Sequence, residues 1–317
     1  MAENSKIEWT HHTFNPWRGC TKVSAGCAHC YAEMLSKRNP RSLGVWGPQG
    51  ARVVAAEGYW REPLKWNAAA MAAGERRRVF CASLADVFEG PETMPADSWP
   101  VVQRARERLF RLIEDTRQLD WLLLTKRPEN AARMWWIDPV TGESWSPPNV
   151  WLGTSVENQE AADERIPHLF NVPAVVRFLS CEPLLGPVDL DPFLYCDGCT
   201  IDSISRGDEH RPRCPVTRAG RKLGWVIAGG ESGHQARPMH PGWARKLRDQ
   251  CEAAGVPYLF KQWGEWIPFR QTPEGWTRTT EEIHGWGEAG VSYYVGKAKA
   301  GRTLDGKIWD EFPKVRA

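Results

Sequence analysis

Short apolar runs along the chain end in polar clusters, and most are followed by segments with helical character. Continuous apolar runs of this length are typical of strands that are covered on both faces, as in parallel sheets. The six runs are Val79–Ala82, Trp121–Leu124, Val150–Leu152, Val175–Leu179, Trp225–Ala228 and Tyr258–Phe260. The pattern therefore predicts six buried parallel strands.

Helical periodicity fills several of the gaps between these runs. Val101–Arg117 places apolar residues on one stripe with arginines and acids opposite, which predicts an amphipathic helix. Pro241–Ala254 begins with proline and stops before Gly255, as helices often do. Glu157–Phe170 predicts a weaker helix because Pro167 interrupts its last turn. The alternation predicts an α/β fold, either a partial or complete (β/α) barrel or an open doubly wound sheet.

Two stretches depart from the alternation. Asp191–Lys222 is polar, contains three cysteines and is too short for its own hydrophobic core, so we expect an insertion. The segment after Gly264 is rich in glycine and aromatic residues, and we expect it to pack on the barrel as a cap. The predicted organisation is a βα-barrel domain over residues 1–263, with the insertion at 191–222, and a C-terminal cap over 264–317.

Polar side chains gather where the predicted strands end. In βα barrels the active site is built at the C-terminal ends of the strands. The ionisable residues at these ends are Asp86, Lys126, Arg127, Glu157, Glu182, Glu231 and Lys261. Some of them can instead cap helices or pair with one another. As a set they predict a site, in which Lys126, Glu157 and Glu182 are the candidates for catalysis.

Three cysteines form the sharpest motif. Cys20, Cys27 and Cys30 have the spacing C-x6-C-x2-C and follow Thr13–Trp17, a predicted first strand. Three thiolates can hold three irons of a [4Fe–4S] cluster and leave the fourth iron open to another ligand. Zinc is the alternative, bound by the same sulfurs and one nearby histidine: His11, His12 or His29. Inert buried cysteines or a disulfide explain the clustering less well.

Seven blocks of sequence point to a family. They are Glu8–Thr10, Asn15–Cys20, Leu124–Pro128, Trp151–Asn158, Glu182–Gly186, Gly229–Gly233 and Gly301–Gly306. In these blocks the chain resembles the phage-type three-cysteine-motif proteins, which are radical-SAM-like. The resemblance covers nearly the whole chain and indicates the family more than the reaction.

The resemblance implies a partial βα barrel whose [4Fe–4S] cluster binds S-adenosylmethionine (SAM). An electron donor such as flavodoxin or ferredoxin reduces the cluster, SAM is cleaved to methionine and a 5′-deoxyadenosyl radical, and the radical takes hydrogen from the substrate. It also implies that Cys20, Cys27 and Cys30 ligate the cluster. Glu231 would accept from the methionyl ammonium, and Lys126 or Arg127 would face the carboxylate.

Other site residues belong to the same expectation. The predicted cofactor-binding set is Ser83, Lys126, Arg127, Ser155, Gly229, Gly230 and Glu231. Cys181, at a strand end, would quench or relay a radical. The chain departs from the commonest radical-SAM pattern in two ways, because the first cysteine gap is six residues and Gly-Gly-Glu follows a late strand. A glycine pair at a strand end also suits a tight turn.

A second cysteine cluster lies in the insertion. Cys196, Cys199, His210 and Cys214 have the spacing C-x2-C-x10-H-x3-C. A Cys3His set suits tetrahedral zinc, and a metal would stabilise a segment without a core. An auxiliary iron–sulfur cluster and a loop with unligated thiols are the alternatives. The insertion is also the most basic local patch, which suits phosphate contacts.

Composition and charge narrow the classes further. The 317 residues carry 41 Lys+Arg against 39 Asp+Glu, a net charge of +2 that gives no general attraction to nucleic acid. No apolar run of about 18 residues or secretory signal pattern is present, so we expect a cytoplasmic protein with no membrane partner.

The leading hypothesis is a radical-SAM enzyme acting on a nucleobase, nucleotide or nucleic acid. The alternative is a non-catalytic zinc- or iron–sulfur-containing nucleic-acid-binding protein, in which some of the 18 tryptophans stack on bases.

Overall fold

The structure is a computed structural model that describes residues 4–194, 222–272, 276–277, 280 and 282–314. Two compact units make up the chain. Unit 1 comprises Met1–Thr154 with Val172–Val176, and unit 2 comprises Ser155–Asn171 with Arg177–Ala317. Parallel strands form a seven-stranded sheet in the order β1-β4-β5-β6-β7-β8-β9. The described part of this sheet has β1 and β9 as its two edges, so the α/β fold is a partial barrel rather than a closed one.

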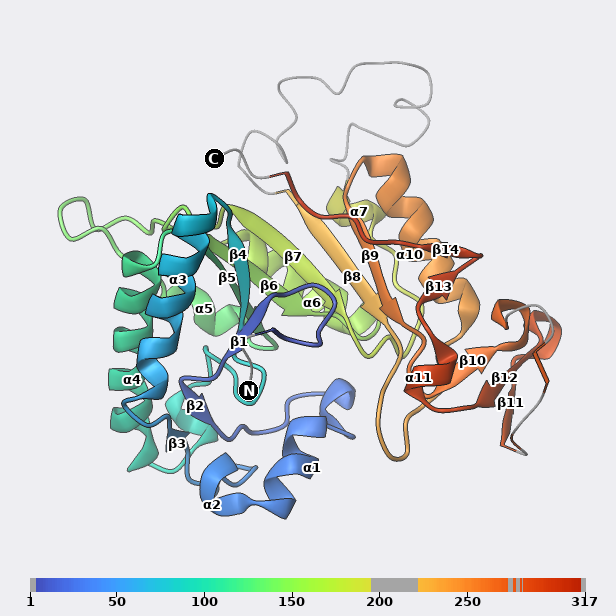
Figure 1. The fold of residues 1–317 in the computed structure, drawn as a ribbon, viewed down its shortest axis with the longest axis horizontal. Helices are drawn as coiled ribbons and strands as arrows, with labels where there is room; N and C mark the ends of the chain where they lie inside the picture. The colour runs from blue at the N-terminus through green and yellow to red at the C-terminus, as the bar shows by residue number, and fades with distance from the viewer. Residues whose placement is uncertain (1–3, 195–221, 273–275, 278–279, 281, 315–317) are drawn as a thin grey trace. The chain divides into compact units, whose positions relative to one another are not determined.

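Unit 1 contains the strands that come first along the chain (Figure 1). Its parallel strands are β1 (His12–Phe14), β4 (Arg77–Cys81), β5 (Leu119–Thr125) and β6 (Val150–Ser155). Its α-helices are α1 (Tyr31–Arg38), α2 (Pro40–Leu43), α3 (Glu62–Ala73), α4 (Ser98–Asp115) and α5 (Pro128–Met134). The helices α3 and α4 lie beside β4 and β5 in both views, and the apolar stripe of α4 is buried.

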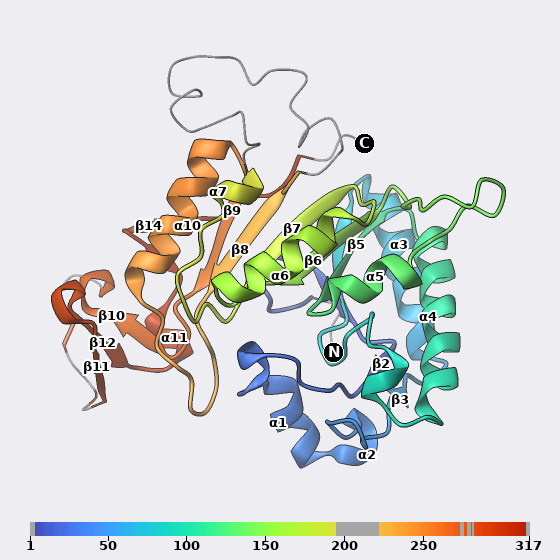
Figure 2. The same ribbon diagram turned by 180° about the vertical axis from the view of Figure 1, so that it is seen from behind.

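Unit 2 contains three parallel strands and a smaller C-terminal sheet. The strands are β7 (Val176–Cys181), β8 (Trp225–Gly229) and β9 (Tyr258–Gln262), with helices α6 (Gln159–Phe170), α7 (Asp191–Leu194) and α10 (Pro241–Ala254). The helix α10 lies beside β8 and β9 (Figure 2). The C-terminal elements are β10 (Trp266–Pro268), β11 (Ile283–Gly285), β12 (Val291–Tyr294), α11 (Lys297–Ala300), β13 (Thr303–Leu304) and β14 (Lys307–Ile308).

All six apolar runs are strands, and the helix predicted over Pro241–Ala254 has those bounds. Two expectations differ in detail. The first strand is split, because Pro16 has no amide hydrogen to donate to a ladder: His12–Phe14 joins the main sheet, whereas β2 (Trp17–Arg18) pairs with β3 (Val53–Val54). Pro167 was expected to interrupt its helix, but α6 continues to Phe170.

Burial and capping explain why α6 tolerates its proline. The Asn158 side chain accepts a hydrogen bond of 3.0 Å from the Ala161 amide at the start of the helix. Ala162, Ile166 and Leu169 are buried on one face. This packing compensates for the hydrogen bond that Pro167 cannot donate.

The C-terminal residues complete the edge of β9. Asp310 forms an antiparallel bridge with Leu259, and the Phe260 amide donates to the Trp309 carbonyl at 3.0 Å. The indole of Trp225 donates to the Glu311 carbonyl at 2.8 Å. These residues therefore pack directly on the β8 and β9 strands of unit 2, and a bare strand edge is avoided.

The block Gly301–Gly306 contains the turn between β13 and β14. Asp305 has a φ of 53° and accepts hydrogen bonds from Arg245, Arg248 and Gln271. These hydrogen bonds, above all the one from Arg245, hold the pKa of Asp305 well below its usual value. The carboxylate therefore pins the β13–β14 hairpin to α10.

None of the helices in the described ranges has the length and apolar character needed to cross a membrane.

His12 on β1 is a buried, neutral base. Its side chain is 2% exposed, and its ring stacks on Trp66 with centroids 4.5 Å apart. Within the described part of the chain, neither ring nitrogen has a hydrogen-bond partner. Burial, with a smaller effect of Arg77, lowers the pKa of His12 to about 4.

We expect this histidine to make stability depend on pH. Between pH 6.5 and about 4 the unfolded chain binds a proton that the folded chain does not, so the free energy of unfolding falls as the pH is lowered through this window. The variant His12→Phe should lose less stability across the window than the wild type, measured by urea denaturation. His168→Phe, at an exposed position, is the control. Equal losses in wild type and His12→Phe would contradict the assignment.

Candidate functional site

The three-cysteine loop lies in unit 1 between β2 and α1. Cys27 ends the short 3-10 helix η1 (Ala25–Cys27), and Cys30 immediately precedes α1. All three thiols are half-buried, and none forms a disulfide. Lys22 closes the loop, because its ammonium donates to the Ala28 carbonyl at 3.2 Å and pairs with Glu33 of α1 at 2.8 Å.

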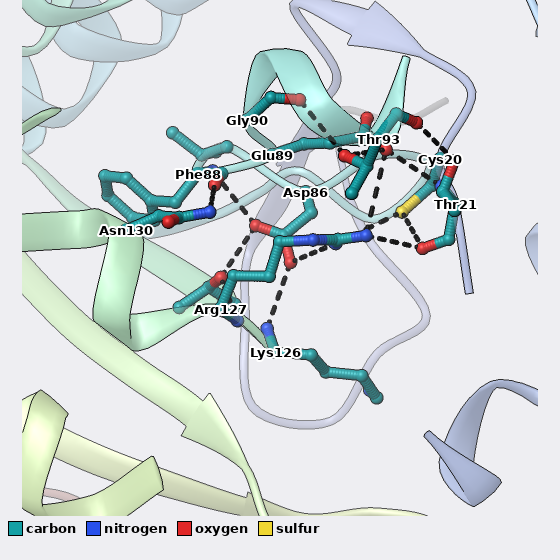
Figure 3. A network of polar contacts seen from close by, with 12 residues as sticks. Cys20, Thr21, Asp86, Phe88, Glu89, Gly90, Thr93, Lys126, Arg127 and Asn130 are labelled. Carbon is teal, nitrogen blue, oxygen red and sulfur yellow. Dashed lines mark hydrogen bonds and ion pairs between the residues drawn. The ribbon is translucent and has the colours of Figure 1, made fainter. Parts of the chain in front are cut away.

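Arg127 contacts the first cysteine from the end of β5 (Figure 3). Its Nη1 lies 3.8 Å from Cys20 Sγ and 3.1 Å from Asp86 Oδ2. Its Nη2 donates to the Thr21 carbonyl at 2.6 Å. The guanidinium belongs to a residue that is only 3% exposed, so these contacts lie in a low-dielectric environment, where charge-assisted hydrogen bonds are strong.

Asp86 organises the turn that follows β4. One carboxylate oxygen accepts from the Thr125 hydroxyl at 2.7 Å and from the Phe88 amide at 2.9 Å. The other accepts from the Lys126 amide at 3.0 Å as well as from Arg127. Asp86 therefore joins the ends of β4 and β5 and aims Arg127 at Cys20.

Glu89 and Arg52 form the second ion pair of this network. Arg52 donates through Nε and Nη2 to the two oxygens of Glu89, at 2.9 and 2.7 Å. Glu89 also accepts from the Thr21 amide at 2.9 Å, and Arg52 donates to the Thr21 hydroxyl at 2.9 Å. The residue next to Cys20 is thus fixed at its amide, hydroxyl and carbonyl.

Burial, with a smaller effect of Glu89 and against the opposing effect of Arg127, raises the pKa of the Cys20 thiol to about 12. Without a metal the thiol is therefore protonated at neutral pH, whereas a coordinated thiol is deprotonated. Three unpaired, half-buried thiols in one loop are a donor set that suits an iron–sulfur cluster. Among the residues described, no three His, Cys, Asp or Glu side chains are grouped closely enough to hold a metal ion.

Two other predicted residues lie near this loop in unit 1. Ser83 accepts from the Asn15 amide group at 3.1 Å, and its carbonyl accepts from the Tyr31 hydroxyl at 2.7 Å, which ties α1 to the end of β4. Lys126 bonds Asp86 through its backbone amide, and its half-buried side chain extends away from the Asp86–Arg127 pair (Figure 3).

In unit 2 the ends of β7, β8 and β9 bring Glu182, Gly229 and Lys261 together. Lys261 Nζ lies 3.0 Å from Glu182 Oε1, and both side chains are half-buried. A Cβ on Gly229 would lie 2.7 Å from the same oxygen. The carboxylate of Glu182 thus lies against the Gly229 backbone, and a larger residue at 229 would require the Glu182 side chain to shift.

Glu157, Ser155 and Cys181 are buried in the packing of unit 2. Glu157 is 1% exposed and forms a 2.8 Å ion pair with Arg165, which also donates to the Ser155 carbonyl at 2.9 Å. Cys181 is fully buried, and burial raises the pKa of its thiol well above the usual value. Arg165 therefore holds Glu157 and Ser155 in place, and Cys181 lies in the core.

The Gly229-Gly230-Glu231 segment is also closely packed. Glu231 accepts from Arg237 with both oxygens, at 2.5 and 2.8 Å, and from the Arg237 amide at 2.8 Å. A Cβ on Gly230 would collide with the carbonyl of Trp263. The segment therefore holds a turn in which the two glycines allow close approach of neighbouring backbone.

The second predicted metal cluster, Cys196, Cys199, His210 and Cys214, lies outside the described residues. Sequence inspection missed two members of the Cys20 network. Glu89 is a second acidic residue three positions after Asp86, following the same strand, and this position could have marked it as a site candidate. Arg52 lies in an irregular loop and carries no such signal.

The family model DUF5131, described as a protein of unknown function, matches residues 4–313. The chain belongs to this family. No curated protein sequence matches the chain.

Solved structures of spore photoproduct lyase are similar to the chain. The lyase complexed with dinucleoside spore photoproduct is 12% identical with a TM-score of 0.37, covering 89% of this chain and 67% of that chain. A cysteine-to-serine variant is 11% identical with a TM-score of 0.41, covering 92% and 70%. Structural similarity this low does not assign an activity to the chain.

The close packing of Gly230 against the Trp263 backbone can be tested by substitution. Gly230→Ala should lower the free energy of unfolding by about 1 to 3 kcal/mol, because its Cβ overpacks against Trp263. Gly285→Ala in β11 is the matched control, since no neighbouring atom lies within 4 Å of its Cβ, and should change stability by less than about 0.5 kcal/mol. Urea denaturation measures both. A Gly230→Ala protein as stable as the wild type would show that this approach is not tight.

Proposed function

We propose that the protein is a radical-SAM-type iron–sulfur enzyme with a [4Fe–4S] cluster on Cys20, Cys27 and Cys30. The observation that carries this proposal is the setting of the cysteine loop: three unpaired thiols, one of them contacted by the buried guanidinium of Arg127 at a strand end. Polar residues from the ends of β4 and β5 surround Cys20, as expected for a site at the mouth of a βα barrel.

A reduced cluster would supply the electron for reductive cleavage of SAM and so give hydrogen abstraction by a radical. The protein would hold the cluster through its three cysteines. Lys126 is the proposed contact for the SAM carboxylate, because its half-buried side chain is directed away from Asp86 and Arg127. Arg127 is committed to Asp86, Thr21 and Cys20.

In unit 2 we propose Glu182 as the residue for proton transfer or substrate binding. It is half-buried, and its carboxylate forms a 3.0 Å ion pair with the Lys261 ammonium. Gly229 keeps the space beside its carboxylate open. Glu157 and Cys181, with 1% and 0% exposure, are assigned to packing.

The proposed substrate is a nucleobase, in a nucleotide or a nucleic acid, and the proposed electron donor is a flavodoxin or ferredoxin. The support for the substrate is the basic stretch over residues 206–222 of the insertion, which has six Lys+Arg against two Asp+Glu. Within that insertion we propose zinc on Cys196, Cys199, His210 and Cys214. The non-catalytic alternative needs exposed stacking platforms. Trp9, Trp17, Trp121, Trp151, Trp225 and Trp263 are fully buried and cannot serve, whereas seven tryptophans keep part of their surface exposed: Trp46, Trp99, Trp145, Trp243, Trp266, Trp276 and Trp286.

Anaerobic reconstitution tests the cluster. Wild-type protein should bind about four irons per chain and release 5′-deoxyadenosine from SAM under a strong reductant. Cys20→Ala should lose most of the bound iron and all of this release, because one of three ligands is removed. Cys251→Ala, which removes a buried thiol on α10, is the matched control and should keep the iron.

Two outcomes would count against the proposal. Iron binding that is unchanged in Cys20→Ala would show that the cluster is elsewhere. Zinc in place of iron on these cysteines, with no 5′-deoxyadenosine formed, would favour the non-catalytic alternative. Zinc analysis of Cys199→Ala separates the second site from the first, since only the zinc content should fall.

A further inference from the structure

Cys20 differs from the other two cysteines in how firmly its surroundings are fixed. The neighbouring Thr21 is bonded at its amide by Glu89, at its hydroxyl by Arg52 and at its carbonyl by Arg127. Cys27 and Cys30 lie in a short 3-10 helix and at the start of α1. The loop is therefore anchored to the sheet at its Cys20 end.

The guanidinium that faces Cys20 is itself held rigidly. Asp86 accepts from Arg127 Nη1 at 3.1 Å, and Glu89 lies 3.8 Å from Nη2. The segment that carries these acids is bonded by Arg106 of α4, which donates to the Val87 and Glu89 carbonyls at 2.8 and 3.0 Å. Arg127 therefore has little freedom to turn toward another ligand.

We propose that Arg127 is a positioning residue for the cluster, which fixes the Cys20 thiolate and raises the reduction potential of the bound cluster. This inference rests on the proposed function. Reduction adds a negative charge to the cluster, and a buried cation that donates to a ligand sulfur stabilises the reduced form more than the oxidised form. The contact of 3.8 Å from Nη1 to Sγ supplies such a donor.

The balance of charge in the network favours this role. Two cations, Arg52 and Arg127, face two carboxylates, Asp86 and Glu89, and the side chains of all four are almost completely buried. Arg52 directs its guanidinium to Glu89, Thr21 and backbone carbonyls. Arg127 is the member of the network that reaches the sulfur.

The test measures the midpoint potential of the reconstituted cluster by redox titration followed by electron paramagnetic resonance, together with iron content. The double variant Arg127→Met with Asp86→Asn removes both partners of one ion pair, so no unpaired charge remains buried. It should bind as much iron as the wild type with a midpoint shifted to more negative potential. The matched control is the double variant Arg108→Met with Glu57→Gln, which removes an exposed ion pair of unit 1 and should leave iron content and midpoint unchanged.

A double variant with full iron content and the wild-type midpoint would overturn the inference. If the double variant fails to fold, Arg127→Lys decides, because a single ammonium cannot reproduce the bonds to the Thr21 carbonyl, Asp86 and Cys20. Its midpoint should also become more negative, and an unchanged midpoint overturns the inference. Wild-type protein that binds no iron on Cys20 would instead refute the proposed function.

Discussion

A buried network of two guanidinium groups and two carboxylates is the constraint on which unit 1 depends. Taking four charges out of water costs several kcal/mol for each ion, and only close pairing offsets that cost. Here Arg52 binds both oxygens of Glu89, and Arg127 binds Asp86. Removing a single member would leave its partner charged and buried, so the network holds as a whole. The position of the cysteine loop follows from it.

The same principle separates the ionisable residues at the strand ends into two groups. Glu157 and Glu231 pair with arginines and are buried in unit 2. Lys126 and the Glu182–Lys261 pair keep part of their surface exposed. Burial thus divides these strand-end residues into buried carboxylates paired with arginines and side chains that keep some exposed surface.

Sequence patterns predicted the scaffold well because apolar runs and helix ends are local signals. The six strands and the α10 bounds needed only the order of residues. Two details differed: the strand predicted over Thr13–Trp17 is split at Pro16, and α6 runs through Pro167 where an interrupted last turn was expected. The strand partners and the buried helix face that decide these details come from distant parts of the chain, which no short window of sequence contains. The cysteine motif was visible, but Arg52 and its pairing with Glu89, 37 positions away, were not. Roles at the metal and SAM sites stay predictions.

The two units are interleaved in sequence. The chain passes from one unit to the other between residues 154 and 155, 171 and 172, and 176 and 177. No single cut can therefore yield the two units as separate fragments. A cut after residue 263 would divide unit 2 itself, because residues 309–311 bond to β8 and β9. Dissection of this protein into working parts would have to proceed by side-chain substitution rather than by truncation.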